Sequence, residues 1–74
     1  MPSVPLLKPQ EVIKAFEKLR WETVRQKGSH IIMTKKNHIA TLSIPNHSEV
    51  ARGTLRRLIA KADITIEEFI EISD

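Results

Sequence analysis

The chain has 74 residues, enough for one domain in the usual range of roughly 50–200 residues and too few for a multidomain enzyme. Hydrophobic residues make up 41% and charged residues 28%, close to the globular average, so we expect a folded domain with a core. The sequence contains no cysteine, which excludes disulfides, thiolate metal sites and cysteine nucleophiles and suits a reducing cytoplasm. No apolar stretch approaches the roughly 20 residues that span a bilayer. We expect a soluble, cytoplasmic protein.

The charges are divided unevenly along the chain. Residues 1–62 carry all twelve Lys and Arg side chains and four acids, a net charge of +8, whereas residues 63–74 carry five acids and no base. A basic body suggests a polyanionic partner such as nucleic acid, because neutralising phosphates releases counterions. The alternative is a charged surface that only keeps the protein in solution.

The first predicted element is a helix that follows a short lead-in. Residues 1–7 contain two prolines and no hydrophobic periodicity, so we expect them to form a loose segment. Pro9 then stands where a helix tolerates proline, in its first turn. Apolar residues recur at helical spacing after it, at Val12, Ile13, Phe16 and Leu19. This pattern predicts an amphipathic helix over Pro9–Leu19.

Three strands are predicted next. The segment 21–26 is rich in aromatic and β-branched residues, and Gly28 after it permits a turn or bulge. A second strand is predicted over 29–34. A third is predicted over 38–44, with Ala40, Leu42 and Ile44 on one face, and Pro45 stops it. Parallel pairing needs a crossover of a dozen or more residues. The short connections therefore predict an antiparallel meander.

Two further helices follow the strands. A second helix is predicted from apolar residues at helical spacing, Leu55, Leu58, Ile59 and Ala62. Thr65 and Glu68 form the sequence signature of a capping box, with Ile64 and Phe69 as a hydrophobic staple, and predict a short third helix. We expect its inner face to be formed by Ile66, Phe69 and Ile70.

The predicted fold class is α+β in two layers, with helices on one face of a three-stranded antiparallel sheet in the order α-β-β-β-α-α. The other sheet face is then open. We expect it to be edged by basic side chains, namely Arg25, Lys27, Lys35 and Lys36.

His30 is the strongest candidate for a chemical role. Arg25 and Lys27 are cations close to it in sequence, and Gly28 and Ser29 directly precede it. An imidazole can take a proton from a ribose 2′-hydroxyl or give one to a leaving 5′-oxygen, while cations stabilise the extra charge on phosphorus. RNA supplies its own nucleophile, so no metal or other cofactor is needed. The acids of the body are scattered, and glycine-rich phosphate loops are absent, which argues against metal-dependent and nucleotide-hydrolysing enzymes.

Other candidate residues have simpler interpretations. His38 fits the end of a hairpin. His47 lies in a loop from which it could approach the face of His30, although turn formation is the better explanation of it. Trp21 could stack on a base, but a tryptophan directly after a helix is more often part of a core. Arg56 and its neighbours on the second helix either bind RNA or form its solvated side.

These residues together resemble one known family. The segment Arg25-Gln26-Lys27-Gly28-Ser29-His30, then Pro45-x-His47, then Gly53-Thr54-Leu55-Arg56 opening a helix, is similar to the HicA family of bacterial and archaeal toxins. The resemblance covers about residues 8–70, within a single domain over 1–74. Many relatives carry two histidines after Gly-Ser, whereas Ile31 follows His30 here. Strand alternation predicts that Ile31 points to the opposite sheet face.

The resemblance implies an mRNA interferase with a double-stranded-RNA-binding-domain-like fold, neutralised by a HicB-type antitoxin. It implies that His30 is the catalytic residue and that Gly28 and Ser29, which match the motif, shape the site and belong to the RNA-binding surface. By position and charge we assign Arg25, Lys27, Lys35 and Arg56 to RNA binding, and no metal. Two alternatives stay open: a non-catalytic RNA-binding module using the same surface, and a module that docks an acidic protein.

Overall fold

The computed structural model describes residues 3–73, which form three helices and three strands. In chain order these are α1 (Pro9–Lys18), β1 (Trp21–Lys27), β2 (His30–Lys35), β3 (Thr41–Pro45), α2 (Arg52–Lys61) and α3 (Ile66–Ser73). The strands make one antiparallel sheet in the order β1-β2-β3. The predicted α+β class and the order α-β-β-β-α-α are therefore confirmed. The predicted bounds of the first helix and of the first two strands agree with the structure to within one residue at each end.

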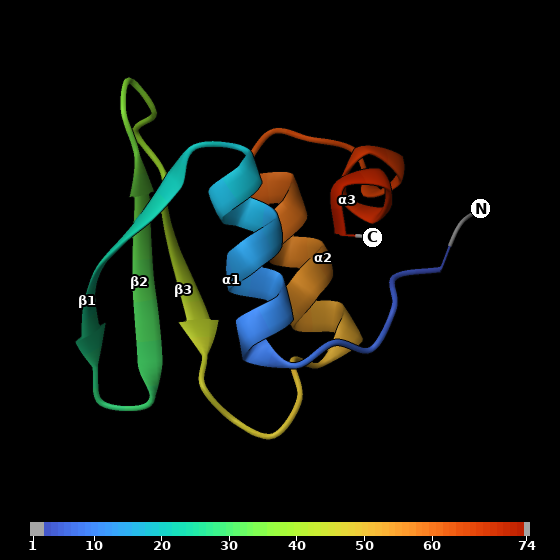
Figure 1. Ribbon diagram of the computed structural model, residues 1–74, viewed down its shortest axis with the longest axis horizontal. Coiled ribbons are helices and arrows are strands. Elements are labelled where there is room, and N and C mark those ends of the chain that lie inside the picture. Colours follow the sequence, from blue (N-terminus) through green and yellow to red (C-terminus); the bar gives the residue numbers. More distant parts are fainter. Residues whose placement is uncertain (1–2, 74) are drawn as a thin grey trace.

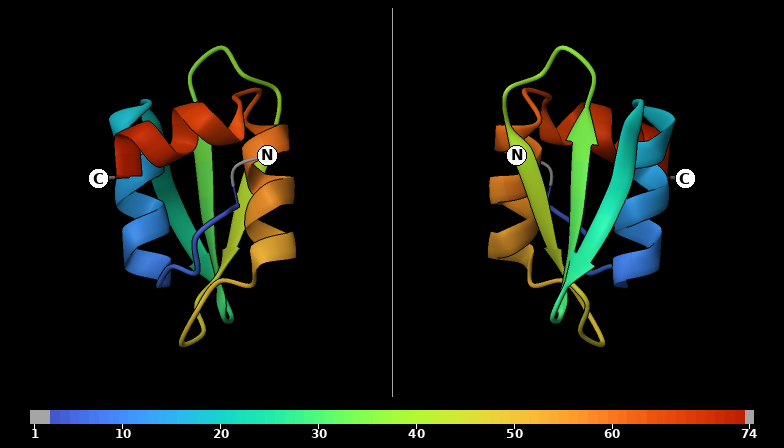
Figure 2. Two further views of the ribbon diagram at one scale, coloured as in Figure 1. Left: turned by 90° about the vertical axis from the view of Figure 1, so that its right-hand side faces the viewer. Right: turned by 90° about the vertical axis from the view of Figure 1, so that its left-hand side faces the viewer.

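The helices lie on one face of the sheet. Figure 1 shows α1 and α2 side by side against the sheet, with α3 beyond them on the side away from the strands. The second panel of Figure 2 shows the opposite sheet face, which no helix in the described part of the chain covers. This is the arrangement of a double-stranded-RNA-binding-domain-like fold, with a short extra helix at its C-terminal end.

The core lies between the sheet and the helix pair and extends under α3. Phe16 of α1 links the layers, because its ring centroid lies 6.4 Å from that of Trp21 and 5.3 Å from that of Phe69. The strands contribute alternate residues, Ile31, Met33, Leu42 and Ile44. Leu55, Leu58 and Ile59 of α2 and its C-cap Ala62 are also buried. These buried positions confirm the predicted inner faces of β3 and α2.

The capping box predicted for α3 is present in full. The Thr65 backbone N–H donates to Glu68 Oε1 at 2.9 Å, and the Glu68 N–H donates to Thr65 Oγ1 at 3.1 Å. These two bonds satisfy backbone donors that a helix start leaves unpaired. Phe69 is fully buried as predicted, but Ile72 rather than Ile70 joins Ile66 in packing against the core.

The N-terminal segment is not loose, which corrects the prediction for 1–7. Met1 and Pro2 lie outside the described residues, but Val4 is fully buried, and its carbonyl accepts a hydrogen bond from Arg52 Nε at 3.0 Å. Leu7 forms a bridge with Val50, whose N–H donates to the Leu7 carbonyl at 2.8 Å. A single buried valine and one bridge leave no periodic pattern, so periodicity could not find them.

The third strand begins and ends later than predicted. It spans Thr41–Pro45 instead of 38–44 because His38 makes its own contacts, including an N–H of Ala40 that donates to His38 Nδ1 at 3.1 Å. Pro45 does not stop the strand before itself but is its last residue, paired with His30. Proline is tolerated on an edge strand, and β3 is one.

Candidate functional site

A tight hairpin turn places His30 at the start of β2. Lys27 and His30 are paired, so Gly28 and Ser29 form a two-residue connection. Gly28 has φ of 59°, and Ser29 is not among the described residues with positive φ, a combination typical of a type II′ turn with glycine first. A Cβ added to Gly28 would meet nothing within 4 Å. Glycine is therefore required here for its backbone conformation and not for space.

A β-bulge in β1 changes the face of the sheet that its odd-numbered residues occupy. Thr23 pairs with Met33 and Arg25 pairs with Ile32, so Val24 is an extra residue between them. Before the bulge the odd-numbered residues of β1 face the helices, and after it they face outward. The turn, which pairs Lys27 with His30, puts Arg25 and Lys27, and not Gln26, on the open face of the sheet, and the bulge lets Trp21 and Thr23 of the same strand face the helices. Basic residues were predicted on this face, but the bulge was not.

His30 is on the central strand of the sheet, at one end of the open face. It stands between Lys27 on β1 and Pro45 on β3, and Arg25 is its diagonal neighbour. Directly opposite residues have Cβ atoms about 4.5–5.5 Å apart and diagonal ones about 7–8 Å, within reach of long side chains. His30 is exposed and has no hydrogen bond or ion pair to any of residues 3–73. Its imidazole is thus accessible beside two cations.

Ile31 lies on the helix-facing side of the sheet, as predicted. It is only 7% exposed and belongs to the core, so it points away from the face that carries His30. The residue that replaces the second histidine of many relatives is therefore a packing residue in this chain.

The loop between β3 and α2 is tied to the hairpin turn. The Asn46 N–H donates to the Ser29 carbonyl at 2.6 Å. His47, the next residue, is exposed and has no partner in the described part of the chain. Both views in Figure 2 show this loop and the β1–β2 turn at the same end of the molecule.

Not all residues assigned to RNA binding come together. Lys35 pairs with Trp21 at the far end of β2 and so takes the helix-facing side of the sheet. Arg56 is exposed on α2, in the helix layer. The structure brings together only the hairpin group, which consists of Arg25, Lys27, Gly28, Ser29 and His30.

The other end of the sheet holds His38 in a packed cluster. Its ring lies 4.9 Å from that of Trp21, Nε2 lies 2.9 Å from Asp63 Oδ2, and Nδ1 accepts from the Ala40 N–H. Trp21 is 1% exposed, and its Nε1 has no partner among the described residues. Both predictions of structural roles hold: Trp21 is a core residue and His38 is held at the hairpin end.

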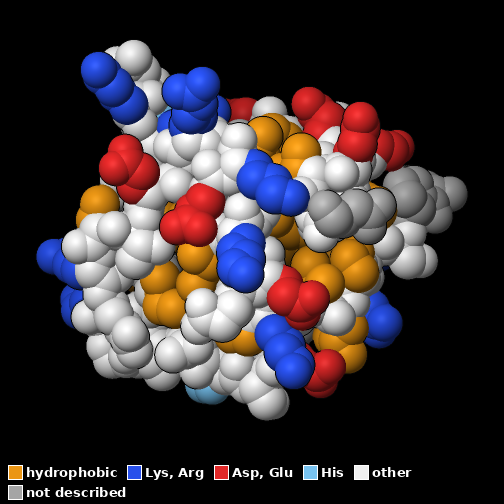
Figure 3. Space-filling view, viewed as in Figure 1, with side chains coloured by type: hydrophobic (Ala, Val, Ile, Leu, Met, Phe, Trp, Pro, Cys, Tyr) orange, Lys and Arg blue, Asp and Glu red, His pale blue; other side chains and the backbone are white. Residues whose placement is uncertain are grey.

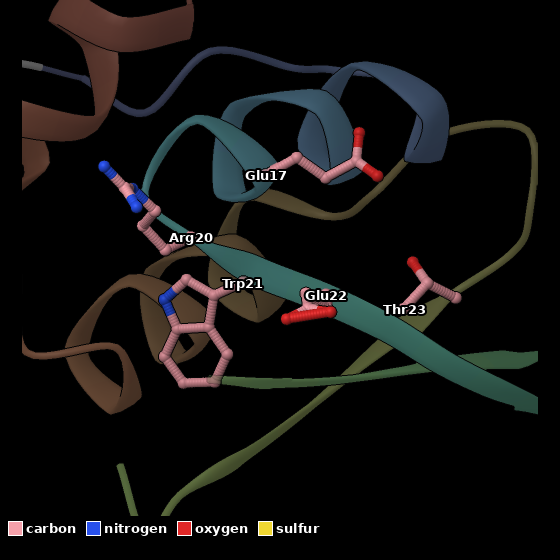
Figure 4. A pocket seen from close by; sticks show the side chains of 5 residues that line it. All are labelled: Glu17, Arg20, Trp21, Glu22 and Thr23. Carbon is pink, nitrogen blue, oxygen red and sulfur yellow. The ribbon is translucent and has the colours of Figure 1, made fainter. Parts of the chain in front are cut away.

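Two concave regions of the surface lie away from His30. A hollow of ≈ 550 Å³ at the junction of α1 and β1 is lined by Glu17, Arg20, Trp21, Glu22 and Thr23 (Figure 4). A second of ≈ 290 Å³ lies between α1 and the end of α3. His30 instead stands on an open sheet face, which suits an extended polymer better than a small molecule enclosed in a pocket. Residues 3–73 contain no group of three or more His, Asp or Glu side chains able to hold a metal.

The molecule is electrically asymmetric. The exposed acids of α3 are Glu67, Glu68 and Glu71, and Figure 3 shows acidic side chains gathered toward that end of the molecule. α3 packs on the side of the helix pair away from the sheet (Figure 1). The acidic helix therefore does not cover the basic open face.

These features define a small α+β domain with an uncovered basic sheet face and an accessible histidine. A family model described as HicA toxin of bacterial toxin-antitoxin matches residues 9–64. The chain belongs to this HicA toxin family, and so to the toxins of toxin–antitoxin systems. No curated protein and no solved structure matches the chain. Over residues 3–73, each helix is too short or too polar to cross a membrane.

Proposed function

We propose that this HicA-family chain is a metal-independent endoribonuclease, an mRNA interferase, that acts in the cytoplasm with His30 as general acid/base. The observation that supports it best is the exposed imidazole of His30 on an open face, directly opposite Lys27 and diagonal to Arg25. An accessible proton-transfer group beside fixed cations is what cleavage of an RNA phosphodiester needs.

The chemistry uses the substrate's own nucleophile. His30 takes the proton of a ribose 2′-hydroxyl or gives one to the departing 5′-oxygen, while Arg25 and Lys27 bind the phosphate oxygens. Gly28 and Ser29 form the turn that holds Lys27 opposite His30. General acid–base assistance is worth about 10²–10⁴ in rate, which fits a slow toxic nuclease.

A HicB-type antitoxin is the proposed protein partner. Family membership implies pairing with an antitoxin, and the uncovered sheet face offers a surface that a partner can occlude. Since this face presents Arg25 and Lys27 and α3 keeps its acids on the other side, an antitoxin segment bearing carboxylates would complement it. Such binding blocks access of RNA to His30.

The experiment compares wild-type protein with His30→Ala on a long single-stranded RNA in EDTA. We expect the wild type to produce fragments and His30→Ala to be slower by about 10²–10⁴. Because His30 is exposed and unpaired within residues 3–73, the variant should keep the wild-type melting temperature and RNA affinity. Lys35→Ala, a cation removed from the other side of the sheet, is the matched control and should cleave normally.

The RNA-binding module without catalysis is the competing function. Within residues 3–73, no group forms a hydrogen bond that would orient the His30 ring, and this favours the alternative. Folded wild-type protein that binds RNA but never cleaves it, or cleavage unchanged in His30→Ala, would establish that alternative and exclude the proposed enzyme.

A further inference from the structure

Cleavage of RNA by its own 2′-oxygen needs proton transfer at two places. The attacking and leaving oxygens of a phosphoryl transfer lie roughly in line on opposite sides of phosphorus. A general base must sit by the 2′-hydroxyl and a general acid by the 5′-oxygen, each within hydrogen-bond reach, about 2.6–3.2 Å. One imidazole fixed on the sheet can serve one side of the phosphorus at a time. The hairpin group contains only one such residue, His30.

Few side chains near His30 can supply the second proton transfer. Arg25 and Lys27 share its face, and we assign both cations to the phosphate oxygens. His38 is at the other end of β2, with both ring nitrogens engaged by Asp63 and the Ala40 N–H. The remaining imidazole is that of His47.

The backbone brings His47 to the His30 end of the molecule. Pro45 pairs with His30, which puts their Cα atoms about 4.5–5.5 Å apart. His47 follows two residues later, so its Cα lies within about 7.6 Å of that of Pro45, at 3.8 Å per residue. The Asn46 hydrogen bond to the Ser29 carbonyl holds the intervening residue against the hairpin turn. The loop that carries His47 thus begins directly beside His30.

The state of the His47 side chain also fits a catalytic group. It is exposed and makes no hydrogen bond or ion pair within residues 3–73. Turn formation, the simpler explanation, does not use its ring, because the bond that ties this loop to the hairpin comes from the Asn46 backbone. The imidazole is left available for a substrate.

We propose that His47 is the general acid of the reaction and His30 the general base, an inference that rests on the proposed ribonuclease function. His30 accepts the 2′-hydroxyl proton as the 2′-oxygen bonds to phosphorus. His47 in its imidazolium form donates its proton to the 5′-oxygen as the P–O5′ bond breaks. The products are a 2′,3′-cyclic phosphate and a free 5′-hydroxyl, and one proton has moved from His47 to RNA and one from RNA to His30.

The test changes the leaving group. An oligoribonucleotide spanning a mapped cleavage site is made with its normal 5′-oxygen and with a bridging 5′-sulfur, which departs without needing a proton. His47→Ala should cleave the oxygen substrate about 10²–10⁴ more slowly than wild type and the sulfur substrate at close to the wild-type rate. His30→Ala should be slow on both substrates.

A matched variant and three outcomes separate the possible failures. Glu49→Gln alters the exposed acid two residues away in the same loop and should leave both rates unchanged. If His47→Ala cleaves the oxygen substrate normally, or is equally slow on both substrates with a normal melting temperature, His47 is not the acid. In those cases His30→Ala still reports on the ribonuclease itself. Wild-type protein that cleaves neither substrate overturns the proposed function together with this inference.

Discussion

The two ends of strand β2 each have a histidine nearby, and the two imidazole rings have opposite environments. His38, just beyond one end, bonds through both ring nitrogens, lies against Trp21 and is only 18% exposed in its side chain. His30, at the other end, is exposed and has no described partner. The residue type is the same, so the structural role of His38 and the availability of His30 follow from the contacts that each ring makes or lacks.

The difference indicates that the His38 end of the sheet contributes to the stability of this small domain and that the His30 end is available for chemistry. Hydrogen bonds and packing at the His38 end fix the entry to β3 and the end of α2, because the partner Asp63 directly follows Ala62 of the core. Groups at the His30 end are left to find partners in a ligand. A variant at one end should therefore change unfolding, and a variant at the other should change activity.

The largest expected effect is on stability, from Trp21→Ala. Trp21 is 1% exposed and contacts both Phe16 and His38. Truncating a buried aromatic costs about 3–5 kcal/mol, and a core of this size rarely supplies more than about 3–5 kcal/mol in total. We expect the variant to be largely unfolded at 25 °C, measured by far-UV circular dichroism and urea denaturation.

Val24→Ala on the same strand is the control for Trp21→Ala. Val24 is 55% exposed, so its loss should change the free energy of unfolding by less than about 0.5 kcal/mol. A Trp21→Ala protein that melts like the wild type would mean that the two ends of the sheet do not differ in this way.

A smaller effect is expected on RNA affinity, from Lys27→Ala compared with Lys35→Ala. Lys27 shares the face of His30, whereas Lys35 takes the helix-facing side at the far end. Each phosphate contact to a single strand contributes about 0.7 to the slope of log K against log salt. Lys27→Ala should lower affinity and reduce that slope by about this amount, and Lys35→Ala should change neither. Filter binding over a salt series measures both, and equal slopes for the two variants would contradict the face assignment.

Most of the fold could be predicted because periodicity carries it. Apolar spacing placed α1 and α2, alternation gave the inner face of β3, and the Thr65 and Glu68 pair predicted the start of α3. The buried Val4 and its hydrogen bond to Arg52 were missed because single contacts between distant segments have no local pattern. The same reason hid the pairing of His38 with Asp63, which lie 25 residues apart.

The site was predicted in composition but not in geometry. Residue type and the motif indicated Arg25, Lys27 and His30, yet the faces of β1 depend on the pairing of Lys27 with His30 and on a bulge at Val24 that leaves Trp21 on the other side. Nothing in the side chain of Val24 indicates a bulge, since valine also fits a regular strand. Lys35 was expected on the open face because its charge was known and its pairing with Trp21 was not.

The smallest expected effect tests the bulge directly, by deleting Val24. The turn fixes Lys27 opposite His30, and removal of the extra residue leaves a regular ladder in which Arg25 still pairs with Ile32 on the open face. We expect RNA cleavage and affinity to stay within about twofold of wild type, which corresponds to about 0.4 kcal/mol. Cleavage assays and amide hydrogen exchange across β1 measure the outcome.

Deleting Gln26 instead is the matched control, because it also removes the bulge while the turn and Lys27 stay in place. In that variant Arg25 moves opposite Ile31, on the helix-facing side, and Val24 takes its place opposite Ile32. A cation is then turned toward the apolar layer, so the Gln26 deletion should lose both stability and RNA affinity. If both deletions behave alike, the face that Arg25 occupies does not matter for RNA binding, and the basic character of the His30 face must come from Lys27 alone.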